Sequence, residues 1–354
     1  MTQDTTTAVT HEERKPDIRT LSNKELKTYI QSLGEKPFRA IQISEWLWQK
    51  NAFSFDEMTN LSKALRSRIQ EDFALYGPMK AVKQVSEDGS RKYLLTLEDG
   101  VSVECVGMPT KNKLAVCVST QAGCGMGCAF CATGKAGLTR SLKYHEIVEQ
   151  VQFVARDFGK DVSSVVFMGQ GEPFANYDEV MKALRCLNSE KGLNIGARHL
   201  TVSTCGVIPG ITRFSKEPEQ FTLAISLHSA VQSTRNDLMP GVKKWSLMHL
   251  HEAMKAYSDR TGRRPTYEYA MIKGVNDSEA ELDALCQFCK KTLCHVNLIP
   301  LNHVPGFKFE PSSAARIGEF QRKLEKYGVE TSIRNSRGRD IAAACGQLKQ
   351  LTDR

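Results

Sequence analysis

The sequence predicts an α/β protein whose larger part is a full or partial β/α barrel and whose N-terminal part is a small helical domain. Two observations predict this fold class. From Leu114 onward, short apolar runs rich in β-branched residues alternate with amphipathic helical patterns, which is typical of βα units around a parallel sheet. Nearer the N-terminus, apolar residues instead return every three or four positions, which is typical of packed helices.

The N-terminal domain contains three such helical patterns, at residues 21–33, 37–50 and 55–73. Residues 1–19 are rich in Thr, Asp, Glu and Lys and lack the apolar core of a secretory signal. We therefore expect a disordered tail at 1–19 on a protein that stays in the cytoplasm. Because Tyr76-Gly77-Pro78 interrupts the helical pattern, we place a helical accessory domain at 20–78.

A β-meander is expected at residues 79–110, where two Asp-Gly pairs mark turns, and the barrel core at 111–354. The expected barrel strands are 114–119, 162–168, 199–204, 222–227, 266–272, 296–301 and 330–333. The expected barrel helices are 144–158, 177–188, 247–260, 278–293 and 314–327. In such barrels catalytic groups lie at the C-terminal ends of the strands, so candidate site residues are sought there.

Composition narrows the class of function. The chain of 354 residues has a net charge of +8, which favours a polyanionic partner such as RNA. It contains no apolar run near the roughly 20 residues that a membrane span requires, so we expect no membrane association. Its 11 cysteines would stay reduced in the cytosol, which favours metal, redox or catalytic chemistry over a disulfide framework.

Three cysteines, Cys124, Cys128 and Cys131, lie on a glycine-rich loop directly after the first expected barrel strand. Such a loop can wrap thiolates and backbone amides around a small anionic cluster. A [4Fe-4S] cluster normally takes four thiolates, so three would leave one iron open to another ligand. A zinc knuckle or three packed cysteines would also fit the residue types. Zinc would need a fourth ligand nearby, and no His or Cys follows at a suitable spacing.

Polar residues also follow other expected strands. Gly171 and Glu172 lie after the second strand, where glycine permits close approach of a ligand and Glu172 offers an acceptor for an ammonium group. Ser203 ends the next strand, Ser226-Leu227-His228 ends the one after it, and Asn302 follows a later strand. Polar groups at strand ends indicate ligand contacts, although serines there also cap helices.

The cysteine spacing, with an aromatic residue before the last cysteine, resembles that of the radical S-adenosylmethionine (SAM) superfamily, and Gly171-Glu172-Pro173 resembles its "GGEP" motif. Further motifs extend the resemblance over nearly the full chain to the RlmN/Cfr family of RNA adenine methyltransferases. These motifs are residues 117–124, Ser203-Thr204, Ser226-Leu227-His228, 274–277 and 344–348. The resemblance implies a radical SAM partial β/α (TIM-like) barrel with a small N-terminal helical accessory domain.

The resemblance also assigns ligands. Cys124, Cys128 and Cys131 would hold one [4Fe-4S] cluster, whose open iron would bind SAM. The implied SAM contacts are Gly171, Glu172, Ser203, Ser226, Leu227, His228 and Asn302.

Three catalytic residues are implied as well. The target carbon of adenine has no lone pair to attack a sulfonium methyl group, so direct displacement from SAM should fail. The resemblance implies that one SAM methylates Cys345, and that a second SAM is cleaved to a radical that activates this methyl group for addition to the base. Cys117 would then release the product by forming a transient disulfide with Cys345, and Glu104 would accept the ring proton. By their surroundings alone, both cysteines would be interpreted as packed side chains.

The resemblance leaves two branches open. RlmN-type enzymes methylate C2 of an adenine in 23S rRNA and of the adenine beside the tRNA anticodon, whereas Cfr-type enzymes methylate C8 and confer antibiotic resistance. Pro173 and the helical domain favour the RlmN branch, while Gln170 departs from the Met usual in both. Two more distant classes are a methylthiotransferase, which would normally bring a second cluster, and a non-catalytic iron-sulfur RNA-binding protein. We expect a monomer that receives electrons from a flavodoxin or ferredoxin.

The remaining sequence features are weaker indications of function. Basic clusters that could hold RNA are Lys111 with Lys113, Lys243 with Lys244, Arg260 with Arg263 and Arg264, and Arg334 with Arg337 and Arg339. The Cys286-x-x-Cys289 pair, followed by Cys294-His295, suggests zinc, but its helical spacing favours packing. Cys105, Cys186 and Cys205 are likewise interpreted as small buried side chains.

Overall fold

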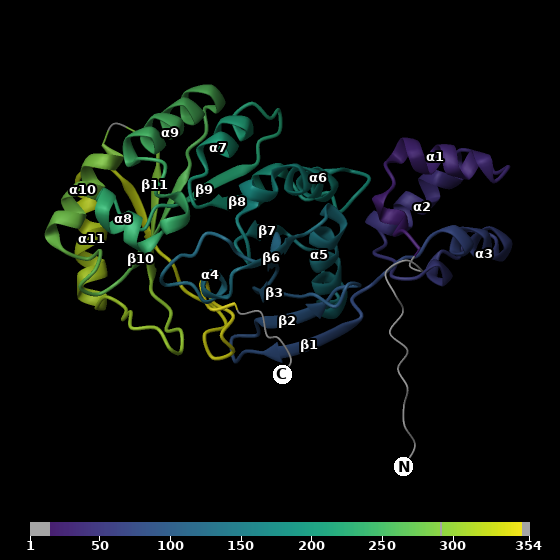
Figure 1. Ribbon diagram of the computed structural model, residues 1–354, viewed down its shortest axis with the longest axis horizontal. Helices are drawn as coiled ribbons and strands as arrows, with labels where there is room; N and C mark the ends of the chain where they lie inside the picture. Colours follow the sequence, from purple (N-terminus) through teal and green to yellow (C-terminus); the bar gives the residue numbers. More distant parts are fainter. Residues whose placement is uncertain (1–14, 291, 349–354) are drawn as a thin grey trace, which may run out of the picture. The chain divides into compact units, whose positions relative to one another are not determined.

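The computed structural model describes residues 15–290 and 292–348 (Figure 1). The expected tail at residues 1–14 lies outside this description. The chain divides into two compact units: residues up to Pro78 together with 190–193, and Met79–Ser189 together with the residues from Asn194 onward. No helix in the described residues is long and apolar enough to cross a membrane.

The smaller unit is built from three α-helices around an apolar core. The helices are α1 (Asn23–Ser32), α2 (Phe38–Trp48) and α3 (Lys63–Asp72), with short 3-10 turns η2 (Ile18–Thr20) and η3 (Phe55–Glu57). Ser22 begins α1 with a capping box, in which its hydroxyl accepts from the Glu25 amide and the Glu25 carboxylate accepts from the Ser22 amide.

Two expectations for this unit were wrong. The single helix expected at 55–73 is divided, because Ser62 is the N-cap of α3 and its hydroxyl accepts from the Leu65 amide at 3.2 Å. Of the disordered tail expected at 1–19, residues 15–19 are described, and the burial of Ile18 and Arg19 contradicts disorder there. The Arg19 guanidinium pairs with the Asp17 carboxylate at 2.7 Å, so the folded chain includes both residues.

The larger unit is organised around one ten-stranded sheet in the order β1-β2-β3-β4-β7-β8-β9-β10-β11-β12. Strands β1 (Lys80–Val85), β2 (Arg91–Thr96) and β3 (Ser102–Pro109) form the expected antiparallel meander. Strand β3 also pairs antiparallel with β4 (Leu114–Cys117), with Val106 opposite Cys117. The meander therefore extends the barrel sheet instead of forming a separate connecting segment.

The parallel part of the sheet runs from β4 to β12, and helices pack outside it, as the βα alternation predicts (Figure 1). The strands after β4 are β7 (Ser164–Phe167), β8 (Leu200–Thr204), β9 (Thr222–Ser226), β10 (Thr266–Met271), β11 (His295–Pro300) and β12 (Glu330–Ile333). The helices are α5 (Tyr144–Phe158), α6 (Tyr177–Asn188), α7 (Ile208–Phe214), α8 (Gln232–Leu238), α9 (Leu247–Thr261), α10 (Glu279–Cys289) and α11 (Ala314–Lys326). Short 3-10 turns are η4 (Pro173–Asn176), η5 (Ala197–His199) and η6 (Pro240–Val242). The architecture is the expected partial barrel.

Several short elements were not expected. Helices α7 and α8 are only seven residues each, too short to give a clear periodic pattern. Strands β5 (Gln121–Gly123) and β6 (Leu138–Ser141) form a separate two-stranded sheet. The cysteine loop and α4 (Ala132–Ala136) lie between these two strands in the chain. Conversely, α10 ends at Cys289 and not at 293. Cys286, Cys289 and Cys294 are buried, as helical packing predicts.

Asn276 ties together the C-terminal ends of two barrel strands. Its amide nitrogen donates to the carbonyls of His228 and Ala270, both at 2.6 Å, and its amide oxygen accepts from the Ile272 amide at 2.8 Å. The side chain is fully buried. These bonds hold the loop after β9 against the end of β10.

We expect Asn276→Leu to lower the free energy of unfolding by about 3 kcal/mol, because three buried backbone groups would lose their partners. Asn188→Leu is the matched control, since Asn188 makes one such bond, from its amide to the Ile195 carbonyl at 2.8 Å. Its expected loss is about 1 kcal/mol. Urea unfolding of both variants measures the difference, and equal losses would contradict the clamp role of Asn276.

Candidate active site

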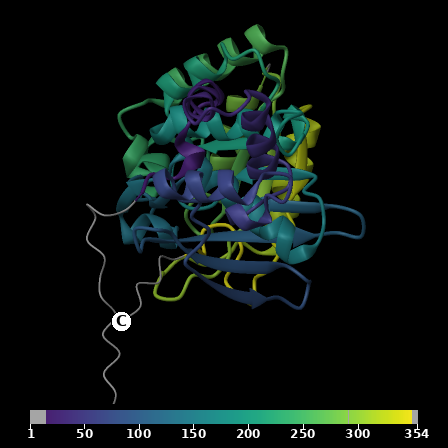
Figure 2. The ribbon, with the colours of Figure 1, turned by 90° about the vertical axis from the view of Figure 1, so that its right-hand side faces the viewer.

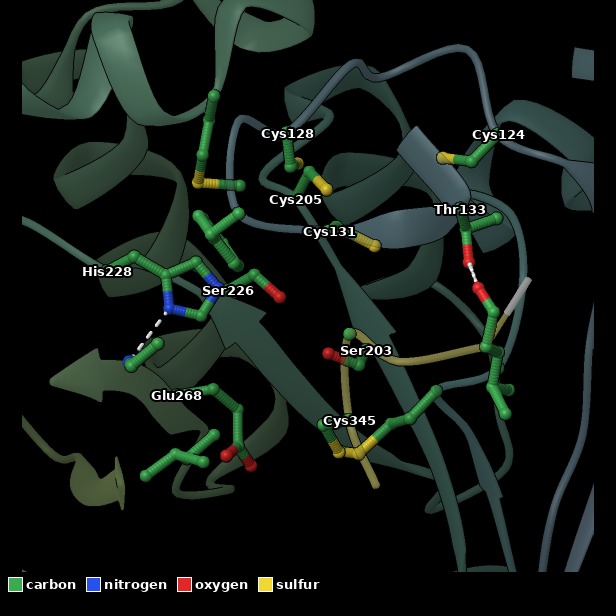
Figure 3. Close-up of a pocket in the computed structure, with 18 of the residues that line it drawn as sticks. Cys124, Cys128, Cys131, Thr133, Ser203, Cys205, Ser226, His228, Glu268 and Cys345 are labelled. Atoms are coloured by element: carbon green, nitrogen blue, oxygen red, sulfur yellow. Dashed lines mark hydrogen bonds between the residues drawn. The ribbon is translucent and has the colours of Figure 1, made fainter. Parts of the chain in front are cut away.

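A cavity opens at the C-terminal ends of the parallel strands, where barrel enzymes carry their catalytic groups (Figure 3). Most of the site residues that the sequence predicts line it. They are Cys124, Cys128, Cys131, Gly171, Glu172, Ser203, Ser226, His228, Asn302 and Cys345. The fold thus brings together residues separated by more than 200 positions in the chain.

The cysteine loop is pinned by the β5–β6 hairpin. The Cys124 amide donates to the Gly137 carbonyl at 2.7 Å. Gly123, which precedes it, has a φ of +77°, and a Cβ at this position would meet the Gly137 oxygen at 2.0 Å. Only glycine fits here, because a side chain would force the loop away from the hairpin. Cys131 ends the loop as the residue before α4.

The three thiols of the cysteine loop suit a positively charged group that can bind each thiolate at a separate atom. Burial raises the pKa of Cys124 to about 12 and also raises the pKa of Cys131. A hydrogen bond with Cys205 is the main reason that the pKa of Cys128 is lowered. Buried thiolates need positive charge beside them, which iron supplies. Within residues 15–290 and 292–348, no three His, Cys, Asp or Glu side chains converge on a point that could hold one metal ion. The thiolates of a [4Fe-4S] cluster instead bind separate irons.

Glu172 places a buried carboxylate in the cavity. Its oxygens accept from the amides of Phe174 at 2.9 Å and Cys205 at 2.7 Å, and burial raises the pKa of the carboxyl group. The preceding Gly171 has a φ of +99°, and a Cβ there would lie 2.6 Å from the Gln121 side chain. A carboxylate held in this way favours a cationic group beside it, as the ammonium group of SAM would be.

His228 presents a neutral imidazole to the cavity. Its Nδ1 accepts a hydrogen bond from the Ala270 amide at 3.0 Å, so the proton is on Nε2, which can donate to a ligand. Burial, followed by the nearby charge of Arg235, lowers the pKa of His228 to about 3. The Phe130 ring packs edge-on against the imidazole at 4.8 Å. The aromatic residue before Cys131 therefore shapes the site.

The other predicted SAM contacts differ in position. Ser203 and Ser226 lie at the ends of β8 and β9 and line the cavity. The Leu227 side chain is fully buried and is absent from the cavity lining. The Asn302 amide nitrogen donates to the Cys345 carbonyl at 3.2 Å, whereas its buried Oδ1 has no hydrogen-bond partner among the residues described. Asn302 can therefore accept a hydrogen bond from a bound molecule.

Cys345 and Cys117 are neighbours despite their distance in sequence. Cys345 lines the cavity, and Cys117 ends β4 in an apolar cluster with Val106, Ala343 and Leu348. Burial raises the pKa of Cys117 to about 12, and the charge of Cys345 adds to this effect. Arg334 opposes it. Cys117 thus packs against residues on both sides of Cys345 in the chain.

Glu104 lies beside the cavity but does not line it. It is buried on β3, two residues before Val106, so it faces the same side of the sheet as Cys117. Its carboxylate pairs with the Lys92 ammonium at 3.3 Å, and Lys92 also donates to the Ala342 carbonyl at 3.3 Å. Lys92, which the sequence did not single out, thus connects Glu104 to the segment that carries Cys345.

Of two more charged residues at the cavity, Glu268 was missed from the sequence and Arg334 was given a different role. Glu268 lies on β10 between buried tyrosines and lines the cavity. Its carboxylate accepts a hydrogen bond from the side-chain amide nitrogen of Asn297 at 2.9 Å. A charged residue in the middle of a buried parallel strand is the signal that could have found it. Arg334 pairs with Glu268 at 3.6 Å and lines the same cavity. The charge of Cys345 is the main reason that the pKa of Arg334 is raised. The sequence had grouped Arg334 with basic residues that bind RNA.

Comparison with known proteins agrees with this geometry. Residues 17–75 match the family described as the ribosomal RNA large subunit methyltransferase N-terminal domain, and residues 118–286 match the radical SAM superfamily. A protein of Bacillus velezensis named probable dual-specificity RNA methyltransferase RlmN is 46% identical, with 99% of this chain and 98% of the relative covered. Its namesake from Geobacillus kaustophilus is 47% identical over 94% of this chain and 92% of the relative. The crystal structure of a radical SAM methyltransferase from Sphaerobacter thermophilus superposes with a TM-score of 0.91 at 41% identity, covering 95% of this chain and all of that one.

The high pKa of Cys117 gives a testable pH dependence. Because only the thiolate is alkylated, we expect labelling of Cys117 by iodoacetamide to rise about tenfold per pH unit between about pH 8 and 10. Cys294 is the internal control, since a hydrogen bond with Cys289 lowers its pKa to about 7 and its labelling should be flat over this range. Peptide mass spectrometry measures both rates. A plateau for Cys117 below pH 10 would contradict the assignment.

Proposed function

The chain belongs to the RlmN family of radical SAM RNA methyltransferases, and from this premise we propose that it methylates C2 of an adenine in 23S rRNA and of the adenine next to the anticodon in tRNA. One observation carries the proposal: Cys345 lines the same cavity as the three thiols of the cysteine loop, and Cys117 lies beside it. The names of the relatives, dual-specificity RNA methyltransferases, and the net charge of +8 support an RNA substrate.

Cys124, Cys128 and Cys131 would hold the [4Fe-4S] cluster. SAM bound at this cluster would supply both the methyl group and the radical that activates it. Glu172 would accept from the ammonium group of SAM, while His228 Nε2 would donate to the bound molecule and Asn302 Oδ1 would accept from it. Ser203 and Ser226 border the same space. Leu227 would contribute by holding its neighbours Ser226 and His228 in place, because its side chain faces the core and its amide donates to the Glu268 carbonyl at 3.0 Å.

Cys345 would act as the methyl carrier. Its position on the cavity lets its sulfur accept a methyl group and deliver the methyl carbon to the base, which leaves the protein covalently joined to RNA. Glu104 would take the ring proton, and its pairing with Lys92 favours the ionised form that a base requires. Once the adduct has returned its unpaired electron to the cluster, the Cys117 thiolate would attack the Cys345 sulfur and form a disulfide as the bond between that sulfur and the new carbon breaks. The electron pair of the broken bond would pass to the carbon, which would take up a proton to become the methyl group.

The preference for C2 over the C8 position methylated by Cfr-type enzymes has two supports. Pro173 follows Glu172, as in the RlmN branch, and the N-terminal unit matches the domain of ribosomal RNA methyltransferases. Gln170, the departure from the usual Met, is buried and absent from the cavity lining, so its side chain does not alter the surface that would face the base.

The remaining assignments complete the proposal. Residues 20–78 would be a helical accessory domain, 79–110 a connecting part of the sheet, and 111–354 the catalytic core. A flavodoxin or ferredoxin would donate the electron, and the protein would act as a monomer in the cytoplasm.

The deciding experiment uses full-length protein reconstituted with iron and sulfide without oxygen, then supplied with SAM, a reductant and either tRNA or a 23S rRNA fragment. We expect 2-methyladenosine, 5′-deoxyadenosine and a methyl group on Cys345, all measured by mass spectrometry. If 8-methyladenosine were the sole methylated product, the C2 assignment would be wrong. If no SAM were cleaved, the protein would act as an iron-sulfur RNA-binding protein.

The resolving role of Cys117 has its own test. We expect Cys117→Ala to accumulate RNA covalently bound to Cys345, because no thiol would remain to break the link. Cys105→Ala is the matched control, since Cys105 is also buried but lies on β3 one residue before Val106 and so faces the opposite side of the sheet. Denaturing gels and peptide mass spectrometry detect the adduct. An active Cys117→Ala preparation free of bound RNA would remove Cys117 from the mechanism.

A further inference from the structure

Arg235 is a buried cation that has no carboxylate partner among the residues that the structure describes. It lies on α8, is 3% exposed, and directs its guanidinium at backbone carbonyls. One terminal nitrogen donates to the carbonyls of Ser226, at 2.9 Å, and of Leu227, and the other donates to the Cys205 carbonyl at 2.7 Å. Within residues 15–290 and 292–348, no Asp or Glu oxygen lies within ion-pair distance of it.

Arg19 in the smaller unit shows how the chain otherwise buries this group. Arg19 is 2% exposed, and its guanidinium forms a two-point pair with Asp17, at 3.0 Å and 2.7 Å. Burying a guanidinium without an anion costs much of its hydration energy, and carbonyl dipoles replace only part of it. Accordingly, burial lowers the pKa of Arg235 to about 10. An anion beside Arg235 would remove this cost.

The position of Arg235 identifies that anion. Ser226, Cys205 and Met239, which its guanidinium contacts, all line the cavity, whereas Arg235 itself does not. It therefore lies behind the cavity wall, where it cannot touch a molecule bound inside. The cysteine loop lies against the helix that carries Arg235, because the amide of Ala129, next to Cys128, donates to the Leu238 carbonyl of α8 at 2.9 Å, and the groups that interact electrostatically with the guanidinium are the thiols of Cys205 and Cys128. Figure 3 shows these two side chains together at the cysteine loop.

We propose that Arg235 is the built-in counter-ion of the iron-sulfur cluster and raises its reduction potential. Three thiolates outweigh the positive charge of an oxidised cube, so the cluster with its ligands is anionic, and reduction adds a further negative charge. A fixed positive charge behind Cys128 stabilises the reduced form more than the oxidised form. In a low-dielectric surrounding this interaction is strong, because water does not screen it. Arg235 is thus a positioning residue for electron uptake.

Two variants separate charge from hydrogen bonding. Arg235→Lys keeps the positive charge with fewer donors, and Arg235→Gln keeps amide donors without the charge. The midpoint potential of the reconstituted full-length protein is measured by electron paramagnetic resonance during a dithionite titration, with neither SAM nor RNA present. We expect Arg235→Gln to reduce the ratio of reduced to oxidised cluster at a fixed potential about tenfold, which corresponds to 59 mV for one electron. Arg235→Lys should stay within about twofold of the wild type.

The other outcomes also decide the question. Loss of iron from Arg235→Gln, with retention by Arg235→Lys, would support the counter-ion role. A wild-type potential in Arg235→Gln would overturn it. Equal lowering in both variants, or loss of the cluster or of the fold in both, would assign Arg235 to strand-end hydrogen bonding alone. Because RNA is absent, failure here is distinct from failure of the substrate proposal.

Discussion

The structure depends on keeping several charges at one end of an apolar sheet, where water cannot stabilise them. Each charged side chain around the cavity therefore needs a specific partner. Glu172 has two backbone amides, Glu268 has Asn297 and Arg334, and Glu104 has Lys92. A bound cluster would provide the partners that the cysteine loop and Arg235 lack. Its iron atoms would bind the thiolates, and the net negative charge of the cluster with its ligands would stabilise the guanidinium. The site is thus preorganised for an iron-sulfur cofactor.

A second consequence concerns the segment that carries Cys345, which the proposed mechanism requires to stay close to both the cysteine loop and Cys117. Hydrogen bonds from surrounding elements hold its backbone in place. The Ala132 amide donates to the Gly346 carbonyl at 2.9 Å, and the Thr133 hydroxyl donates to the Leu348 carbonyl at 2.8 Å, both from the start of α4. Asn302 and Lys92 bind the carbonyls of Cys345 and Ala342. The C-terminal segment lies beside the meander strands in both ribbon views (Figure 1, Figure 2).

The meander of β1, β2 and β3 contributes side chains to the proposed active site. Because β3 pairs with β4, Glu104 and Lys92 face the same side of the sheet as Cys117 and reach the Cys345 segment. An antiparallel extension thus adds Glu104, the proposed proton acceptor, to one edge of a parallel barrel. The three cysteines proposed to hold the cluster, the proposed methyl carrier Cys345 and the proposed resolving thiol Cys117 then belong to three separate parts of the chain that meet at a single sheet.

The sequence by itself determined the order of the barrel strands and the longer helices and the position of the cysteine loop, because hydrophobic periodicity and ligand spacing are local properties of the chain. It also placed the polar strand ends correctly, since parallel strands end at a common edge. Only the tertiary structure decided which charges meet: Lys92 with Glu104, Arg334 with Glu268, and Arg235 with none in the described residues. Such pairings join residues up to 66 positions apart, and they follow from sheet register and burial, which no local pattern records.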